Sequence, residues 1–287
     1  MDFPMHAGPH PGFITQRPNG LAGWMACFDP ATLPILSSSA AMIEEWRANE
    51  DAVDAHLLAE SLASDALFTI KLFAHLARLR RGRQDSEPET LVQALVLLGI
   101  GPFFRDFAPQ ASVDERLAAV PEALAGFHAV QERARRAARF ALAFAVQRMD
   151  RDNAVLHGVA LLHDFAELLL WLHAPDFALE IARRQQADST LRSATVQMEV
   201  LGIRLYELQH ALMREWQLPR VLIDFADAKR ESSSVQARNV LLAIRLARHT
   251  AKGWDNAALT DDVRDIAELL HMGVEPTLAL LRDIDCD

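Results

Sequence analysis

Two adjacent residues of this chain, His163 and Asp164, have side chains that could bind a divalent metal ion. They lie in the apolar run 160–170, which reads ALLHDFAELLL. Imidazole nitrogen and carboxylate oxygen are both common metal ligands. A hydrolytic metal site needs at least three protein ligands and an open position, at which a bound water becomes acidic. The chemistry open to this pair therefore depends on whether further ligands come from elsewhere in the chain.

Two other histidines are badly placed to share an ion with His163. His157 precedes it by six residues, so on a straight helix the two side chains point about 120° apart. His173 follows it by ten residues, which is nearly in phase but about 15 Å further along the axis. Only His128 and His210, on other predicted helices, remain open as additional ligands.

A buried histidine–aspartate pair without a third ligand more often has a structural role. Buried polar groups need hydrogen-bond partners whether or not they take part in chemistry. We therefore favour an interpretation in which Asp164 accepts hydrogen bonds and His163 donates one within the core. This interpretation predicts no bound metal and no cofactor.

Apolar residues recur at helical spacing along most of the chain, and strand-like alternation is nearly absent. The residues from Asp152 or Asn153 to Leu169 predict one long helix that carries the pair. Gly202, in the next long predicted helix, suggests the close approach of a neighbouring helix. The other predicted helices cover residues 37–49, 54–62, 65–81, 88–99, 114–127 with an interruption near Pro121, 131–149, 177–184, 196–216, 239–251, 263–270 and 275–284. The sequence predicts an all-α protein of roughly a dozen helices in two lobes.

Composition excludes several classes of partner. The net charge is −10, which disfavours general binding to nucleic acid or to anionic lipid. The longest uncharged apolar stretch, 90–104, has about 15 residues and is short of the ~20 that a membrane span needs. Cys27 and Cys286 stand far apart and belong to no motif, so we expect a reduced, cytoplasmic location.

Two groups of arginines could bind anions. The first is a candidate site for a nucleotide messenger and consists of Arg78, Arg80, Arg81 and Arg83. Because cations are favourable at the negative end of a helix, a solvated helix terminus is the preferred interpretation of this group. The second group lies on several sides of one predicted helix and is expected to pair with acidic residues; it consists of Arg133, Arg135, Arg136 and Arg139. Trp216 is expected to serve in core packing.

Four stretches occur in the order that one known family shows. Residues 58–72 resemble its LAE.I..DP.LT.KLL segment, 90–99 its I.QAI..LG segment, 158–164 its AGLLHDIG segment and 216–219 its W.LP segment. Over residues 31–229 the chain thus resembles the HDOD proteins. These are bacterial signalling relatives of the metal-dependent HD phosphohydrolases.

The chain departs from the active HD enzymes at the positions where the resemblance implies further ligands. An upstream histidine is expected near residues 134–136, and here Ala134, Arg135 and Arg136 stand. A histidine common after the glycine that corresponds to Gly202 is replaced by Leu205. Paired histidines that often follow W.LP fall near Ala228 and Lys229, and the usual Gly-Lys after the pair is Ala166-Glu167. The resemblance therefore implies a degenerate metal site.

The resemblance implies a non-catalytic output or adaptor protein that acts on other signalling proteins, with His163 and Asp164 as a residual pair. A homo-oligomer remains open. The alternative is a divergent phosphohydrolase for a nucleotide or cyclic dinucleotide, in which His128 or His210 completes the site. A third hypothesis is a messenger-binding regulator that uses the first arginine group.

The expected domain organisation follows from the same comparison. A flexible tail is expected over residues 1–28, an N-terminal helical lobe over 29–115, an HD-like helical lobe over 116–230 and a C-terminal helical extension over 231–287. The seam is expected around Pro109 to Pro121, between the N-terminal helical bundle and the bundle that carries the pair.

Overall fold

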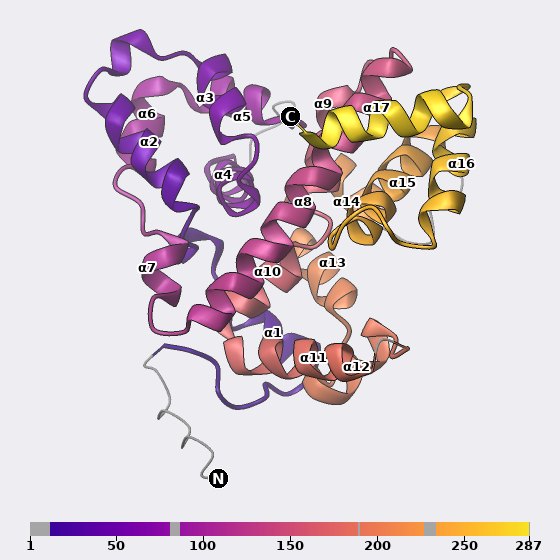
Figure 1. Cartoon of the computed structure of the whole chain (residues 1–287). Coiled ribbons are helices and arrows are strands. Elements are labelled where there is room, and N and C mark those ends of the chain that lie inside the picture. The colour runs from indigo at the N-terminus through magenta and orange to yellow at the C-terminus, as the bar shows by residue number, and fades with distance from the viewer. Residues whose placement is uncertain (1–11, 81–86, 189, 227–233, 287) are drawn as a thin grey trace.

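A computed structural model describes residues 12–80, 87–188, 190–226 and 234–286, and it is helical throughout (Figure 1). No strand occurs among these residues, and an isolated bridge joins Ile35 to Ser112. The prediction of an all-α fold is confirmed.

The first half of the chain forms eight α-helices in the described residues. They are α1 (Gly20–Met25), α2 (Ser37–Arg47), α3 (Ala55–Leu62), α4 (Ala66–Leu79), α5 (Leu91–Leu98), α6 (Ile100–Phe107), α7 (Val113–Leu117) and α8 (Pro121–Gln147), with short 3-10 helices η1 (Pro30–Thr32) and η2 (Glu50–Ala52).

The second half continues with further helices, several of which pack on α8. They are α9 (Asn153–Leu161), α10 (Phe165–His173), α11 (Pro175–Ala187), α12 (Ser193–Leu201), α13 (Leu205–Glu215), α14 (Arg220–Ala226), α15 (Val235–His249), α16 (Leu259–Leu270) and α17 (Val274–Cys286).

Side-chain caps begin several of these helices. Asp54 accepts a hydrogen bond from the backbone N–H of Leu57 at 2.8 Å, and Asp65 accepts one from Phe68 at 2.9 Å. The second oxygen of Asp65 accepts from the N–H of Leu36 at 2.8 Å, so one buried carboxylate joins two segments. Such caps satisfy N–H groups that the helix itself leaves without partners.

The long helix α8 corrects one prediction. The sequence suggested a helix interrupted near Pro121 and a second one from residue 131, but α8 is continuous over 27 residues. Pro121 is its first residue, where the missing N–H of proline costs least. The helix crosses the middle of the molecule, with α2–α6 on one side and α15–α17 on the other (Figure 1). Buried alanines along α8 let α9 and α15 pack closely.

Two helices predicted as continuous are divided. The predicted helix 196–216 ends at Gly202, whose φ of +72° is the left-handed conformation that glycine tolerates at a helix C-terminus. The role predicted for Gly202, close packing inside a helix, is therefore wrong. The predicted helix that carries His163 and Asp164 is divided between α9 and α10.

The segment Asn153–His173 is long and apolar enough to cross a membrane, but 72% of its most apolar window is buried within the fold. Its leucines and Phe165 belong to the main hydrophobic core. The apolar character of this segment is therefore used for packing against α8 and α13.

Ordered structure begins earlier than the predicted boundary at residue 29. Residues 1–11 lie outside the described part of the chain, but Trp24 in α1 is fully buried and its indole donates to the carbonyl of Leu201 at 3.1 Å. The N–H of Ile14 donates to the carbonyl of His173 at 2.7 Å. The segment from residue 12 to 28 therefore packs against the second half of the chain.

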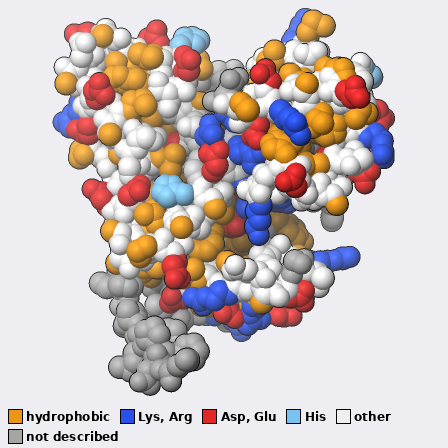
Figure 2. Space-filling view, in the orientation of Figure 1, with side chains coloured by type: hydrophobic (Ala, Val, Ile, Leu, Met, Phe, Trp, Pro, Cys, Tyr) orange, Lys and Arg blue, Asp and Glu red, His pale blue; other side chains and the backbone are white. Residues whose placement is uncertain are grey.

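The C-terminal helix is attached to α8 by a buried ion pair. Asp285 of α17 accepts two hydrogen bonds from the guanidinium of Arg136, at 2.7 and 2.8 Å, and one from the indole of Trp254 at 3.0 Å. Basic and acidic side chains are intermingled over the face of the molecule seen in Figure 2.

Candidate functional site

The His163–Asp164 pair lies in the turn between α9 and α10. The N–H of Leu162 closes the last full turn of α9 on Gly158 at 3.0 Å, whereas the N–H groups of His163 and Phe165 make long contacts of 3.4 and 3.5 Å to residues three positions earlier. Helix α10 then starts with Asp164 as its N-terminal flanking residue. The angles worked out for a straight helix therefore do not hold beyond residue 161.

A glutamine from α13 completes the hydrogen bonds of this turn. The side-chain amide of Gln209 donates to the carbonyl of His163 at 2.6 Å, and its oxygen accepts from the N–H of Ala166 at 3.3 Å. Gln209 is buried. A buried break in a helix would otherwise leave backbone groups without partners, so this residue stabilises the turn.

Two arginines hold the carboxylate of Asp164. Arg133 of α8 donates to its Oδ2 through Nε at 3.1 Å and Nη2 at 3.0 Å, and Arg248 of α15 donates to its Oδ1 through Nη2 at 2.8 Å. The imidazole Nε2 of His163 lies 3.8 Å from the same Oδ1. Both carboxylate oxygens thus face cationic donors.

Glu167 joins the cluster one turn further along α10. Its Oε2 accepts from Nη2 of Arg133 at 2.6 Å, so a single guanidinium bridges two carboxylates. The cluster therefore pairs two arginines with two acidic residues, beside the imidazole of His163.

Burial and the neighbouring positive charges have opposite effects on the pKa values of the two carboxylates in the cluster. Burial alone would raise the pKa of Asp164, but the positive charges of Arg248, His163 and Arg133 outweigh it and hold that pKa well below its usual range. Burial raises the pKa of Glu167, with a further contribution from the charge of Asp164, against the opposing effect of Arg133. Asp164 is therefore the firmly ionised member of the cluster.

The C-terminal extension packs beside His163. Among the described residues, a space of about 10 Å³ lies between His163 and the apolar face of α15. It is lined by His163, Phe225, Ala237, Val240, Leu241 and Ile244. A cavity of this size holds at most about one water molecule. Side chains of α14 and α15 thus pack beside the imidazole, which itself keeps 29% of its surface exposed.

The two histidines left open by the sequence have other neighbours. His128, near the start of α8, lies 3.5 Å from the carboxylate of Asp114 on α7. His210 of α13 has a buried Nε2 without a hydrogen-bond partner among the described residues. Burial lowers the pKa of His157 and that of His173 to about 4, with a contribution from Arg116 at His173.

The donor set at the pair does not fit a metal ion. Within the described residues no group of three or more His, Cys, Asp or Glu side chains is placed to hold one. Arg133 and Arg248 occupy the lone pairs of Asp164 that would face a metal, and their fixed positive charges would repel it. Arginine has no acceptor with which to coordinate a cation.

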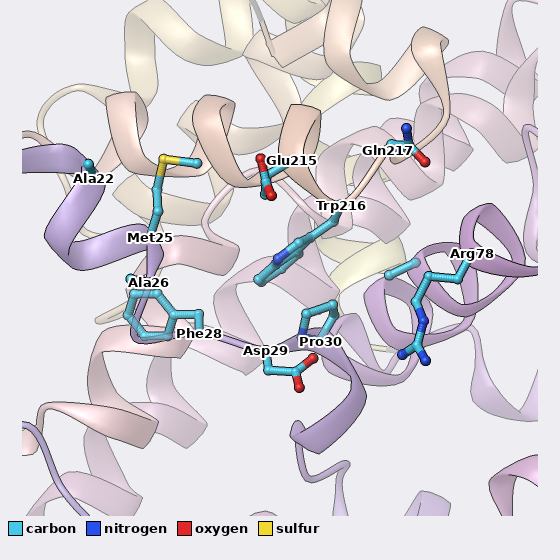
Figure 3. A pocket seen from close by; sticks show the side chains of 11 residues that line it. Ala22, Met25, Ala26, Phe28, Asp29, Pro30, Arg78, Glu215, Trp216 and Gln217 are labelled. Atoms are coloured by element: carbon cyan, nitrogen blue, oxygen red, sulfur yellow. The ribbon is translucent and has the colours of Figure 1, made fainter. Parts of the chain in front are cut away.

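The arginine group at the end of α4 is only partly described. Arg81 and Arg83 lie outside the described residues. Arg80 is the C-terminal flanking residue of α4 and is half-buried, whereas Arg78 is exposed. Arg78 lines a cavity of about 580 Å³ between α1, α4 and the end of α13 (Figure 3).

The second arginine group pairs with acidic side chains, as the sequence predicts. Arg133 contacts Asp164 and Glu167, Arg135 contacts Glu132, and both Arg136 and Arg139 contact Asp285.

Sequence reasoning did not identify the two arginines that define the site. Arg133 stands one residue before the stretch at which an upstream histidine is expected. From the sequence it was expected only to pair with acidic residues, and none of these was identified. Arg248 lies 84 residues from Asp164. No local spacing could have connected it with the pair.

Comparisons with known proteins agree with this fold. Residues 33–232 match the model of a family described as the HDOD domain. The structure is similar to that of the MmoQ response regulator from Methylococcus capsulatus, with a TM-score of 0.67 and 21% identity over 87% of this chain and 97% of that chain. A virulence factor from Campylobacter jejuni gives a TM-score of 0.60 at 17% identity, with 83% of each chain covered. No curated protein matches the sequence.

Proposed function

This chain belongs to the HDOD domain family, and from that premise we propose that it is a non-catalytic signalling protein that acts by binding another protein. The observation that supports the proposal best is the state of Asp164. Its two oxygens accept three hydrogen bonds from the guanidinium groups of Arg133 and Arg248.

The chemistry of phosphoester hydrolysis explains why this arrangement matters. A metal-dependent hydrolase uses the cation to neutralise charge that develops on the phosphoryl group and to generate hydroxide at neutral pH. In this chain the negative charge of Asp164 is already balanced by two fixed cations that cannot activate water. The pair then stabilises the junction of α8, α10 and α15.

The position of α15 supports the same proposal. This helix lies in the C-terminal extension and beyond residue 232, where the family match ends. It supplies both Arg248 and the apolar side chains that pack beside His163. The same helix also packs on α16, which holds Arg248 in place beside Asp164.

The proposed partners are other signalling proteins in the cytoplasm. A net charge of −10 supports a role without nucleic acid or anionic membrane as partners. The name response regulator, which the Methylococcus neighbour bears, is in keeping with a signalling role.

The hydrolysis of phosphodiesters tests this proposal. Purified full-length protein is incubated with bis(p-nitrophenyl) phosphate or with a cyclic dinucleotide, with and without added Mn²⁺, and an active HD phosphohydrolase serves as the positive control. The proposal predicts turnover equal to that of a protein-free blank, for the wild type and for His163→Ala alike. Manganese-dependent turnover that is lost in His163→Ala would instead establish the phosphohydrolase alternative.

A further inference from the structure

A hollow with a mixed apolar and charged lining lies away from the His163–Asp164 pair. Its volume is about 580 Å³, within the range of about 300–1,000 Å³ typical of ligand pockets. Segments distant in the sequence form it, namely α1 with the residues that follow it, the last turn of α4 and the end of α13 (Figure 3). The lining residues used below are Met25, Phe28, Asp29, Arg78, Glu215 and Trp216.

The floor of this hollow contains a buried indole whose N–H group has no partner in the described part of the chain. Trp216 is only 7% exposed, and its Nε1 has no hydrogen-bond partner among the described residues and yet is not sealed from solvent. The indoles of Trp24 and Trp254 do have acceptors, the carbonyl of Leu201 and the carboxylate of Asp285. Buried tryptophan N–H groups usually have a partner, so the N–H of Trp216 is available to an acceptor on a bound ligand.

Apolar surface surrounds the indole on one side. The ring of Trp216 lies in the middle of the hollow, and Met25 and Phe28 lie together beside it (Figure 3). Phe28 is buried and Met25 is partly exposed. The indole also packs on Phe165, with ring centroids 5.9 Å apart. Packing on Phe165 therefore helps to fix the indole, and Met25 and Phe28 offer apolar surface beside it.

The rim of the hollow carries more acid than base. Asp29 and Glu215 lie on opposite sides of the Trp216 ring, and Arg78 lies further along the rim (Figure 3). All three charged side chains are exposed. One oxygen of Asp29 accepts from the N–H of Ala31 at 2.9 Å, and the side chain of Glu215 has no ion-pair partner among the described residues. Two carboxylates against one guanidinium favour a cationic group from the ligand.

The indole N–H, the apolar surface and the acidic rim together suit the binding of a protein segment, and the inference rests on the proposed protein-binding function. We propose that this hollow docks a segment of a partner protein in which an apolar side chain lies next to a lysine or arginine. The apolar side chain packs on Met25, Phe28 and Trp216. The cation lies between Asp29 and Glu215, and a backbone carbonyl of the segment accepts from the indole N–H.

The shape of the hollow favours a segment of a larger surface over a free small molecule. Small-molecule sites usually bury 70–90% or more of their ligand. Here every charged lining residue is exposed, and only the floor, with Phe28, Ala74 and Trp216, is buried. A side chain that projects from a partner protein needs only such a floor, because the partner itself covers the rim.

Selection of random peptides tests the proposal directly, because it needs no purified partner protein. A phage library of random 12-residue peptides is selected against the full-length chain, and the enriched peptides are labelled with fluorescein for anisotropy titrations. The proposal predicts enrichment of Lys or Arg beside Leu, Phe, Met or Trp. It predicts at least about tenfold weaker binding to Glu215→Lys, and about fivefold weaker binding to Trp216→Phe, which keeps an aromatic ring but lacks the donor.

A matched charge change provides the control. Glu60→Lys alters an exposed glutamate on α3 that does not line the hollow, so its affinity for the peptides should equal that of the wild type. Circular dichroism and thermal unfolding verify that each variant is folded. Asp29→Asn, which removes one rim charge without adding bulk, should weaken binding about threefold to fivefold.

Three results would overturn the docking site. These are peptides enriched in acidic residues, the absence of any enriched peptide, and peptides whose affinity is the same for wild type, Glu215→Lys and Trp216→Phe. In the last case the chain would still bind protein segments, and the proposed function would stand with a different surface. Failure of the proposed function itself would appear separately, as phosphodiester turnover in the hydrolysis assay.

Discussion

Replacement of Arg133 by glutamine should destabilise the protein far more than replacement of Arg248. Arg133 makes two hydrogen bonds to Asp164 and one to Glu167, and its side chain is 20% exposed. Arg248 makes one hydrogen bond to Asp164, and its side chain is 49% exposed. The variant Arg133→Gln leaves Asp164 with one partner and Glu167 with none of its present hydrogen bonds to arginine.

The size of the effect follows from the burial of these partners. Removal of one member of a buried ion pair costs about 3–5 kcal/mol, because the other charge stays buried without compensation. The side chains of Asp164 and Glu167 are 14% and 33% exposed, so solvent reaches part of the cluster. We expect a loss of about 2–3 kcal/mol for Arg133→Gln. An exposed pair is worth about 1 kcal/mol or less, which is the expectation for Arg248→Gln.

Urea denaturation at neutral pH, followed by circular dichroism, measures both free energies of unfolding. Arg135→Gln is the matched control, because Arg135 lies on the same helix and loses only an exposed pair with Glu132. A second control is Arg133→Gln combined with Asp164→Asn, in which the loss should be smaller than the sum of the single losses. The reasoning would be refuted if Arg133→Gln cost no more than Arg135→Gln, or less than Arg248→Gln.

Two further expectations concern groups outside the cluster. Burial holds the pKa values of His157 and His173 at about 4, and their unfolded value is about 6.5. The contribution of these histidines to the free energy of unfolding should therefore be fully present above a pH of about 6.5. It should fall as the pH drops towards about 4, by up to about 1.4 kcal/mol per pH unit for each histidine. A free energy of unfolding, measured in urea, that does not change over this pH range would contradict this. Gly126→Ala would place a Cβ 2.5 Å from the ring of Trp171 and should lower the free energy of unfolding by about 1–2 kcal/mol. The Cβ of Gly158→Ala would meet nothing within 4 Å, so this variant should stabilise α9 by up to about 1 kcal/mol. Equal melting temperatures of the two variants would count against the close packing of α8 on α10.

Local patterns were sufficient for most of the helices but not for their breaks. Caps such as Asp65 and the spacing of apolar residues depend on neighbours within one or two turns, so they can be read from the sequence. The break at residues 162–164 could not be predicted in this way, because the apolar spacing continues from α9 into α10. It depends on Gln209, which lies on another helix and forms hydrogen bonds with the backbone groups of the break.

The candidate sites were likewise predictable only where they depend on residues close together in the sequence. Spacing along the chain excluded His157 and His173 as partners of His163 on a straight helix, and the conclusion of a sparse donor set rested on that reasoning. The arginine partners of Asp164 come from α8 and α15, and no period in the sequence connects these helices. The hollow around Trp216 was missed for a related reason, since its three segments meet only when the chain is folded.

The metal content of the native protein tests the central claim most directly. The chain is purified without chelators from cells grown with added manganese and iron, and Mn, Fe, Zn and Mg are measured by mass spectrometry. Because Arg133 and Arg248 already balance Asp164, the account predicts substoichiometric metal, at the same level in the wild type and in His163→Ala. One or two metal ions per chain in the wild type, lost in His163→Ala, would contradict it.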